Sequence, residues 1–200
     1  MMIREITNEN EMRKAFDIYL EAFPAGERLP IEMLRQRFEE QSERIYAFYP
    51  EDSEQNPEHN QELMAFATIF FLGKIIDSRP QSFAVLNYFA VSRQGRSKGY
   101  GEQFLKHLID ITHNDKQILI FEIDNPYQSE LDSQEYRRLL FYRKSSVVEY
   151  PDFIYYMPAF GSGERIDMKL LSAGTSEPLS PDELAIIRDN IHRKMYNMDI

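Results

Sequence analysis

The chain has 200 residues, of which 42% are hydrophobic and 28% are charged, and its formal net charge is −10. This composition is typical of a globular protein with a substantial core, and the acidic balance argues against a nucleic-acid-binding protein, which usually presents a basic face. The chain contains no cysteine, which excludes a disulfide framework, a thiol nucleophile and a cysteine-ligated zinc site.

The N-terminal segment does not resemble a signal peptide, because acidic residues occur within its first ten positions and it has no long apolar stretch. The longest apolar run, MAFATIFFL from Met64, is too short to span a bilayer and is typical of a strand. We therefore expect a cytoplasmic protein that does not bind membranes. The four histidines are scattered along the sequence, so we expect no metal site.

The first half of the chain predicts a strand, two helices and three further strands. Residues 3–6 form a short strand candidate, and apolar residues then recur at helical spacing from Met12 to Phe23, where Pro24 ends the helix. Asn8 or Thr7 can cap this helix. The remaining elements are a loop at 25–30, a shorter helix through Ile31, Leu34 and Phe38, and strands at 44–49, 62–72 and 82–91. The polar segment 51–61 is expected to form the tip of a hairpin.

The second half begins with a helix from Gly99 to about His113 and a continuous apolar strand at 117–123, which is typical of a central strand covered on both faces. The strands before and after this helix should be parallel. A helix at 133–145, strands at 147–157 and 165–171, and a helix opened by the capping box at Ser180 follow.

These elements predict an α/β fold. It has a mixed central sheet of about seven strands, flanked by helices on both faces. The absence of a long linker or an internal repeat predicts a single domain over residues 1–200, with the C-terminal helix at about 181–196.

The turn between the strand at 82–91 and the helix after it combines glycines with basic residues. Glycines let the backbone approach a ligand closely, and the first N–H groups of a helix attract anions, so a pyrophosphate would suit this turn. A tight turn with solvated basic residues is the alternative. The Walker pattern is absent, and the dinucleotide pattern fails because Phe104 stands where its third glycine would be.

The segment from Arg96 to Gly101 does match an [RQ]-x-x-G-x-[GA] turn, here preceded by NYFAV. With the FYRK segment downstream, it resembles the GCN5-related N-acetyltransferases, the GNAT superfamily, over nearly the whole chain. In that family the turn binds the pyrophosphate of acetyl-CoA, and the pantetheine arm enters where the preceding strand diverges from the next. The resemblance implies cofactor binding by Phe89, Ala90, Val91, Arg96, Ser97, Lys98, Gly99, Tyr100 and Gly101.

The resemblance also implies a catalytic role for Tyr142, which occupies the place of the family's tyrosine in FYRK. Its phenol could protonate the departing thiolate of coenzyme A; a core tyrosine is the alternative. Two positions depart from the family pattern. Glu135 stands seven residues before the tyrosine, where the family often has asparagine, and Ser146 stands where it often has glycine.

Glu122 is a carboxylate within an apolar strand. Burying its charge there costs free energy unless the carboxylate has a hydrogen-bonding or ionic partner or takes part in catalysis. Some members of the resembled family place a glutamate on this strand as the base that deprotonates the amine. A salt bridge to Arg137 or Arg138 from the following helix is the alternative, and a water path could also remove the proton.

The resemblance places the acceptor beside the loop between the two early helices, where Glu27 and Arg28 are candidate contacts. Asn87 and Tyr88 are adjacent on a strand and should therefore point to opposite faces, with one of them toward the acceptor.

The sequence thus favours an acetyl-CoA-dependent N-acetyltransferase, an enzyme that acts on a primary amine of a small molecule or peptide. The alternative is a non-catalytic acyl-CoA-binding or regulatory protein on the same fold. The expected partners are acetyl-CoA and an amine, without a metal, nucleic acid or membrane. A homodimer through the strand at 165–171 is also conceivable.

Overall fold

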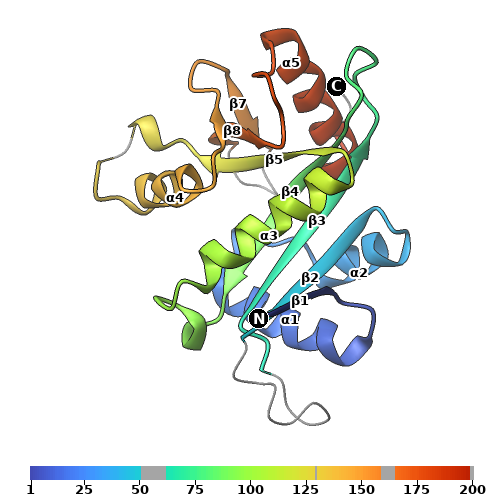
Figure 1. The fold of residues 1–200 in the computed structure, drawn as a ribbon, viewed down its shortest axis with the longest axis vertical. Coiled ribbons are helices and arrows are strands. Elements are labelled where there is room, and N and C mark those ends of the chain that lie inside the picture. Colours follow the sequence, from blue (N-terminus) through green and yellow to red (C-terminus); the bar gives the residue numbers. More distant parts are fainter. Residues whose placement is uncertain (51–61, 129, 159–164, 199–200) are drawn as a thin grey trace. The chain divides into compact units, whose positions relative to one another are not determined.

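The computed structural model describes residues 1–50, 62–128, 130–158 and 165–198. Its elements, drawn in Figure 1, are β1 (Met2–Glu5), α1 (Glu9–Ala22), η1 (Ala25–Glu27), α2 (Ile31–Glu39), β2 (Glu43–Tyr49), β3 (Ala65–Gly73), β4 (Ser82–Val91), η3 (Arg93–Gly95), α3 (Tyr100–Asn114), β5 (Gln117–Asp124), η4 (Pro126–Gln128), α4 (Gln134–Arg143), β6 (Val148–Glu149), β7 (Tyr155–Met157), β8 (Ile166–Ala173), α5 (Pro181–Asn190) and η5 (Ile191–Met195). The hairpin tip predicted at 51–61 lies outside the described residues.

In the described part of the chain, eight strands form a sheet in the order β1-β2-β3-β4-β5-β8-β6, and β7 also pairs with β8. The pairs β1–β2, β2–β3 and β5–β8 are antiparallel, whereas β4 and β5 pair in parallel through residues 82–86 and 117–121. These findings confirm the predicted mixed α/β sheet and the parallel step around α3.

The single strand predicted at 147–157 is wrong. This segment instead forms β6 and β7, separated by a turn in which the Phe153 N–H donates to the Tyr150 carbonyl at 3.2 Å. Pro151 explains the break, because proline has no N–H to donate to a strand ladder. The split accounts for eight strands where about seven were expected.

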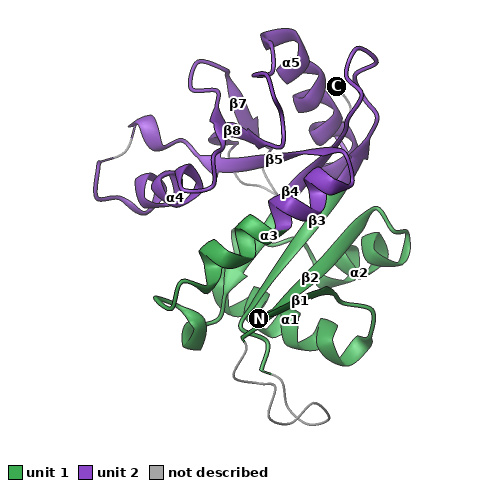
Figure 2. Cartoon of the chain, viewed as in Figure 1, with its two compact units in different colours: residues 1–70, 87–107 green, residues 71–86, 108–200 purple. Residues whose placement is uncertain are grey.

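The chain folds as two compact units, which Figure 2 distinguishes by colour. Unit 1 comprises Met1–Phe70 and Asn87–His107, and unit 2 comprises Phe71–Leu86 and Leu108–Ile200. The elements β3, β4 and α3 each contribute residues to both units. The expectation of a single domain stays a prediction.

Unit 1 has helices on both faces of its strands. On one face, the Tyr19 ring of α1 packs edge-on against Phe66 of β3 at 6.2 Å between centroids. The register pairs Phe66 with Ala47, so the next residue, Phe48, points to the other face. There the Phe48 ring contacts Phe104 of α3 at 5.8 Å. The structure thus confirms the predicted helical cover on both faces for this unit.

The early helices of unit 1 begin and end where their residues predict. The Asn8 side chain caps α1 by accepting a hydrogen bond from the Glu11 N–H at 3.0 Å. α1 ends at Ala22, two residues before Pro24, and α2 begins directly after Pro30. The loop predicted between them contains the short helix η1.

Unit 2 is organised around β5, whose residues Ile118–Phe121 are fully buried. The Tyr142 ring of α4 packs against Phe121 at 5.0 Å between centroids. The next residue, Glu122, points to the other face, where it contacts Tyr196 near the end of the chain. The central strand predicted from the apolar run is therefore confirmed.

The C-terminal helix α5 begins with the predicted capping box. The Ser180 hydroxyl accepts from the Glu183 N–H at 3.3 Å, and the Glu183 carboxylate accepts from the Ser180 N–H at 2.8 Å. Arg79 holds the same carboxylate in a two-bond ion pair, with 2.9 Å between Nη2 and Oε2. The helix continues into the π-helical turn η5, which ends at Met195, close to the predicted end.

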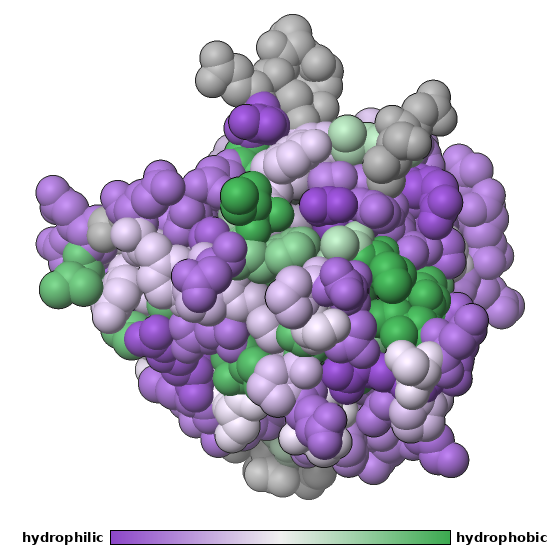
Figure 3. All heavy atoms as spheres, turned by 90° about the horizontal axis from the view of Figure 1, so that it is seen from above, coloured by the Kyte–Doolittle hydropathy of each residue, from purple (hydrophilic) through white to green (hydrophobic). Residues whose placement is uncertain are grey.

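Hydrophilic side chains predominate on the face drawn in Figure 3, where they surround separate hydrophobic areas. Among the described helices, none is long and apolar enough to cross a membrane.

Candidate functional site

The predicted anion-binding turn lies in unit 1, between β4 and α3. Within the described residues, the backbone N–H groups of Ser97, Lys98, Gly99, Tyr100 and Gly101 have no hydrogen-bond acceptor. Five successive unpartnered donors at the start of a 15-residue helix form a concentrated region of positive potential. This arrangement can bind phosphate oxygens through backbone donors.

The backbone of this turn depends on conformations that favour glycine. Gly99 has a φ of +78°, and Ser97 has a φ of +62°. A Cβ built on Gly95 would lie 2.9 Å from Cγ1 of Val91 and 3.1 Å from the Met64 carbonyl oxygen. Gly95 therefore lets η3 pack tightly against β4, and Gly99 turns the chain into α3.

The basic side chains of the turn are attached to it by weak contacts. The Arg96 Nε donates to the Val91 carbonyl at 3.3 Å. The Lys98 ammonium lies 5.9 Å from the centroid of the Tyr100 ring. Both side chains are exposed and can reorient toward an anion.

The three residues expected to meet the pantetheine arm form the end of β4. Ala90 is buried, whereas Phe89 and Val91 are half-buried. The Phe89 ring stacks on Phe104 of α3 at 5.5 Å between centroids. The packing of this ring joins the end of β4 to the helix that carries the turn.

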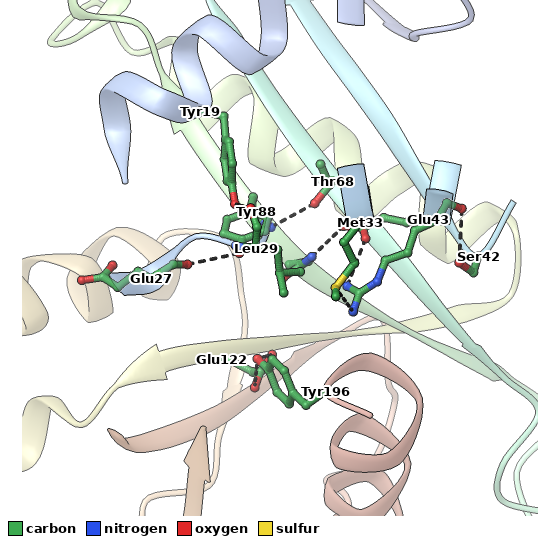
Figure 4. Close-up of polar contacts among 12 residues, drawn as sticks. Tyr19, Glu27, Leu29, Met33, Ser42, Glu43, Thr68, Tyr88, Glu122 and Tyr196 are labelled. Carbon is green, nitrogen blue, oxygen red and sulfur yellow. Dashed lines mark hydrogen bonds and ion pairs between the residues drawn. The ribbon is translucent and has the colours of Figure 1, made fainter. Parts of the chain in front are cut away.

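Tyr88 anchors the loop between α1 and α2 (Figure 4). Its hydroxyl donates to the Glu27 carbonyl at 3.1 Å and accepts from the Leu29 N–H at 3.0 Å. The Tyr19 hydroxyl donates to the Leu29 carbonyl at 3.0 Å, and the two tyrosine rings meet edge-on at 4.7 Å. Burial raises the pKa of both phenols. Tyr88 thus uses its polar atom to fix the loop.

The candidate acceptor residues on that loop remain outside this anchor. Figure 4 shows the Glu27 carboxylate directed away from Tyr88, and the Glu27 side chain is exposed. The Arg28 guanidinium donates to the Leu20 carbonyl at 3.4 Å. Glu27 is therefore accessible to a cationic group.

Asn87 does not point to the face opposite Tyr88, contrary to the prediction from strand alternation. Its amide donates to the buried Glu43 carboxylate at 2.7 Å, and Glu43 also bonds to Thr68. Thr68 in turn accepts from the Tyr88 N–H at 3.2 Å. Both side chains therefore reach the face covered by α1 and α2, which requires a local interruption of the strand pleat.

Glu43 forms a buried ion pair in unit 1. Its Oε2 lies 3.5 Å from Nη1 of Arg37, and both side chains are at most 8% exposed. Burial raises the pKa of Glu43, while hydrogen bonds from Thr68 and Asn87 and the charge of Arg37 lower it. These partners satisfy the carboxylate, which is consistent with a role in stability.

In unit 2, two phenols contact Glu122, and Figure 4 shows one of them, Tyr196. The Tyr155 hydroxyl donates to Oε1, and the Tyr196 hydroxyl lies 3.0 Å from each carboxylate oxygen. Burial raises the pKa of Glu122 to about 7, against the lowering effect of the two hydrogen bonds. A carboxyl group with this pKa exchanges protons readily near neutral pH.

The salt bridge considered for Glu122 is contradicted by the structure. Arg138 pairs instead with Asp124, at 2.6 Å between Nη1 and Oδ2. Arg137 donates to the Asp132 carbonyl through Nε at 2.8 Å. Glu122 is therefore available for another role.

Tyr142 is buried on the opposite face of β5 from Glu122. Its ring contacts Phe121 at 5.0 Å and Phe141 at 5.4 Å. Burial raises the pKa of Tyr142 to about 12. Tyr142 is therefore protonated at neutral pH and can act as a proton donor.

The two departures from the family pattern have different structural consequences. Ser146 has a φ of +55°, the left-handed conformation that a glycine would adopt there. A serine holds this conformation at a cost in strain. Glu135 lies in the first turn of α4, where hydrogen bonds from its own backbone N–H and from the Ser133 side chain lower its pKa. Its carboxylate helps to stabilise the start of the helix.

Sequence reasoning missed Tyr155 and Tyr196 as partners of Glu122. They lie 33 and 74 residues away along the chain, so no local spacing connects them to the carboxylate. The aromatic-rich segment before β8 was the available signal. In the residues that the structure describes, no group of three or more histidines or carboxylates could hold a metal ion.

Comparison with known proteins identifies one family. A model described as the acetyltransferase (GNAT) family matches residues 12–144, which include the turn, Glu122 and Tyr142. Among curated proteins, no sequence matches the chain significantly.

Solved structures share the fold at low sequence identity. A Bacteroides thetaiotaomicron protein described as a GNAT-family acetyltransferase aligns with a TM-score of 0.76 at 20% identity, covering 100% of both chains. A ribosomal-protein-alanine N-acetyltransferase from Brucella melitensis gives 0.58 at 16% identity, covering 86% of this chain and 98% of its own. Spermidine N-acetyltransferase from Vibrio cholerae, solved with CoA and spermine, gives 0.57 at 10% identity, covering 86% and 93%.

Proposed function

Because this chain belongs to the GNAT acetyltransferase family, we propose that it transfers an acetyl group from acetyl-CoA to a primary amine of a small molecule or peptide. The observation that carries the proposal is the row of unpartnered N–H groups from Ser97 to Gly101 at the start of α3. In the Vibrio cholerae relative, CoA is present in the solved complex.

The turn suits a pyrophosphate in both charge and shape. The N–H groups can donate to the phosphate oxygens, and Arg96 and Lys98 can add mobile positive charge. At Gly99, a side chain would approach the bound phosphates. We assign the pantetheine amides to the backbone of Phe89, Ala90 and Val91, whose amides would also polarise the thioester carbonyl.

Acetyl-CoA supplies an activated acyl group. During its transfer the protein must accept one proton and donate another. Glu122, with a pKa of about 7, would accept the proton that the amine loses as it attacks the thioester carbon. Tyr142 would donate its proton to the sulfur as the carbon–sulfur bond breaks. The products are the N-acetylated amine and CoA with a neutral thiol.

The positions of these two residues restrict where the reaction can take place. Tyr142 packs on the Phe121 face of β5, whereas Glu122 points to the other face. A thioester served by both must therefore lie beside an edge of β5 rather than on either face. Holding the reactants there would supply much of the rate enhancement through orientation.

The proposed acceptor carries a cationic amine. Glu27 offers an exposed carboxylate on the loop that Tyr88 anchors, and the net charge of −10 attracts cations. Arg28 and Asn87 are the other candidate contacts. The names of two structural relatives specify spermidine and ribosomal-protein alanine, so spermidine and an alanine-containing peptide with a free amine are the first compounds to screen.

A non-catalytic acyl-CoA-binding or regulatory protein is the second candidate. It is favoured by Glu135, which replaces the expected asparagine. Under either function, we propose that the protein acts in the cytoplasm, because a chain without cysteines does not depend on the oxidising conditions that form disulfides.

A CoA-release assay with the amine panel distinguishes the two candidates. Tyr142→Phe should lower kcat by roughly 100-fold or more, because the acid is lost, while acetyl-CoA binding stays within about twofold of the wild type. Tyr136→Phe, which removes a hydroxyl from the same helix, is the matched control and should keep its activity. Acetyl-CoA binding without acetylation of any amine would favour the non-catalytic candidate.

A further inference from the structure

The segment that follows α5 brings an aromatic cluster to Glu122. The π-helical turn η5 places His192 with its Nε2 2.9 Å from the Tyr156 carbonyl oxygen. The His192 ring lies 5.5 Å from the Tyr155 ring and 6.3 Å from the Tyr196 ring. Single π-helical turns often occur at functional sites, where they redirect side chains.

We propose that Tyr155 and Tyr196 are positioning residues for Glu122, which hold its carboxylate in one orientation and keep it ionised for proton transfer. The proposal deepens the proposed acetyltransferase function and rests on it. The residues differ from the catalytic base because they contact its carboxylate and not the reacting atoms.

The geometry gives each phenol a distinct role. Tyr155 is fully buried on β7 and donates to Oε1 alone, so it restricts rotation of the carboxyl group. Tyr196 lies 3.0 Å from both oxygens and can donate to either of them. Hydrogen bonds to a carboxylate stabilise its ionised form. The pair therefore opposes the effect of burial, which would otherwise keep Glu122 protonated.

The charged groups around this cluster have other partners. His192 faces both tyrosines, and burial lowers its pKa, which favours its neutral form. On β8, Lys169 donates to the Phe153 carbonyl at 3.2 Å. At the end of β5, Arg138 pairs with Asp124. The two phenols are thus the groups that the structure places against the Glu122 carboxylate.

Tyr196→Phe and Tyr155→Phe test the proposal through the pH dependence of kcat/KM. Losing one hydrogen bond should raise the pKa of Glu122, moving the acidic limb of the profile upward by about one pH unit. Activity at pH 7 should then fall several-fold relative to the wild type and recover toward it at pH 9. At each pH, dividing the kcat/KM of the variant by that of the wild type cancels the contribution of the amine's own titration.

Tyr156→Phe is the matched control, because Tyr156 belongs to the same cluster but its hydroxyl does not contact Glu122. Its profile should be unchanged. A loss of activity in Tyr196→Phe and Tyr155→Phe that is equal at every pH would overturn the proposal, since a merely structural role lowers activity without moving the limb.

A carbon NMR titration of the glutamate carboxyl groups separates this proposal from the proposed function. The Glu122 signal is assigned by its loss in Glu122→Gln. A higher pKa of Glu122 in Tyr196→Phe than in the wild type would support the positioning role even if the wild type acetylated no amine. In that case the proposed function alone would fail. An unchanged pKa in an active enzyme would overturn the positioning role and leave the function intact.

Discussion

The ion pair between Arg79 and Glu183 gives the sharpest prediction for stability. Glu183 lies at the start of α5, which leads to Tyr196, and its side chain is 15% exposed. The Arg79 guanidinium lowers the pKa of Glu183 to about 2 from its ordinary value of 4.5. At about 1.4 kcal/mol per pKa unit, and discounted for the solvent screening of an ion pair near the surface, this lowering corresponds to about 1–2 kcal/mol of stability at neutral pH.

Glu183→Gln removes the charge while a glutamine can still complete the capping box. We expect the variant to lose about 1–2 kcal/mol of unfolding free energy at pH 7, as measured by urea denaturation. Because the folded-state pKa is lowered, the contribution is present above about pH 4.5 and is lost as pH falls toward 2. The difference between wild type and variant at pH 3 should therefore be less than half of its value at pH 7.

Asp182→Asn is the matched control, because it removes a carboxylate from the same first turn of α5. Its expected cost is below about 1 kcal/mol. If Glu183→Gln cost no more than this control, or if its effect were the same at pH 3 and pH 7, the ion pair with Arg79 would not contribute the stability assigned to it.

Three further substitutions test local features. Ser146→Gly should raise the unfolding free energy by about 1 kcal/mol, since glycine relieves the positive φ, and a lower melting temperature would contradict this. Gly95→Ala should cost about 1–3 kcal/mol in urea unfolding through its clash with Val91, and a neutral effect would show that the turn can shift. Tyr88→Phe should speed hydrogen exchange of the Leu29 amide, which loses its acceptor, whereas unchanged exchange would mean that the loop is held elsewhere.

Local patterns predicted much of the fold. The spacing of apolar residues located the helices and most strands, and Ser180 located the start of α5. Pro151 was present in the sequence, but the aromatic residues around it favoured one continuous strand over the observed break. At Asn87 and Tyr88, strand alternation failed because both side chains find polar or aromatic partners on one face.

The candidate site could be predicted only where its residues are contiguous. The turn from Arg96 to Gly101 is such a case, because its glycine and basic residues lie together in the sequence. The surroundings of Glu122 are the opposite case, since β5, β7 and the segment after η5 meet only in the folded chain. A local pattern could identify a buried carboxylate there but not the phenols that hold it.

The most direct test of the central claim is a calorimetric titration of acetyl-CoA into the wild type, Gly99→Asp and Gly73→Asp. Gly73 is a matched control because its φ of +77° is close to the +78° of Gly99, so both variants carry the same strain and charge. We expect micromolar binding by the wild type, near-normal binding by Gly73→Asp and at least tenfold weaker binding by Gly99→Asp. No binding by the wild type at millimolar acetyl-CoA, or equal losses in the two variants, would contradict it.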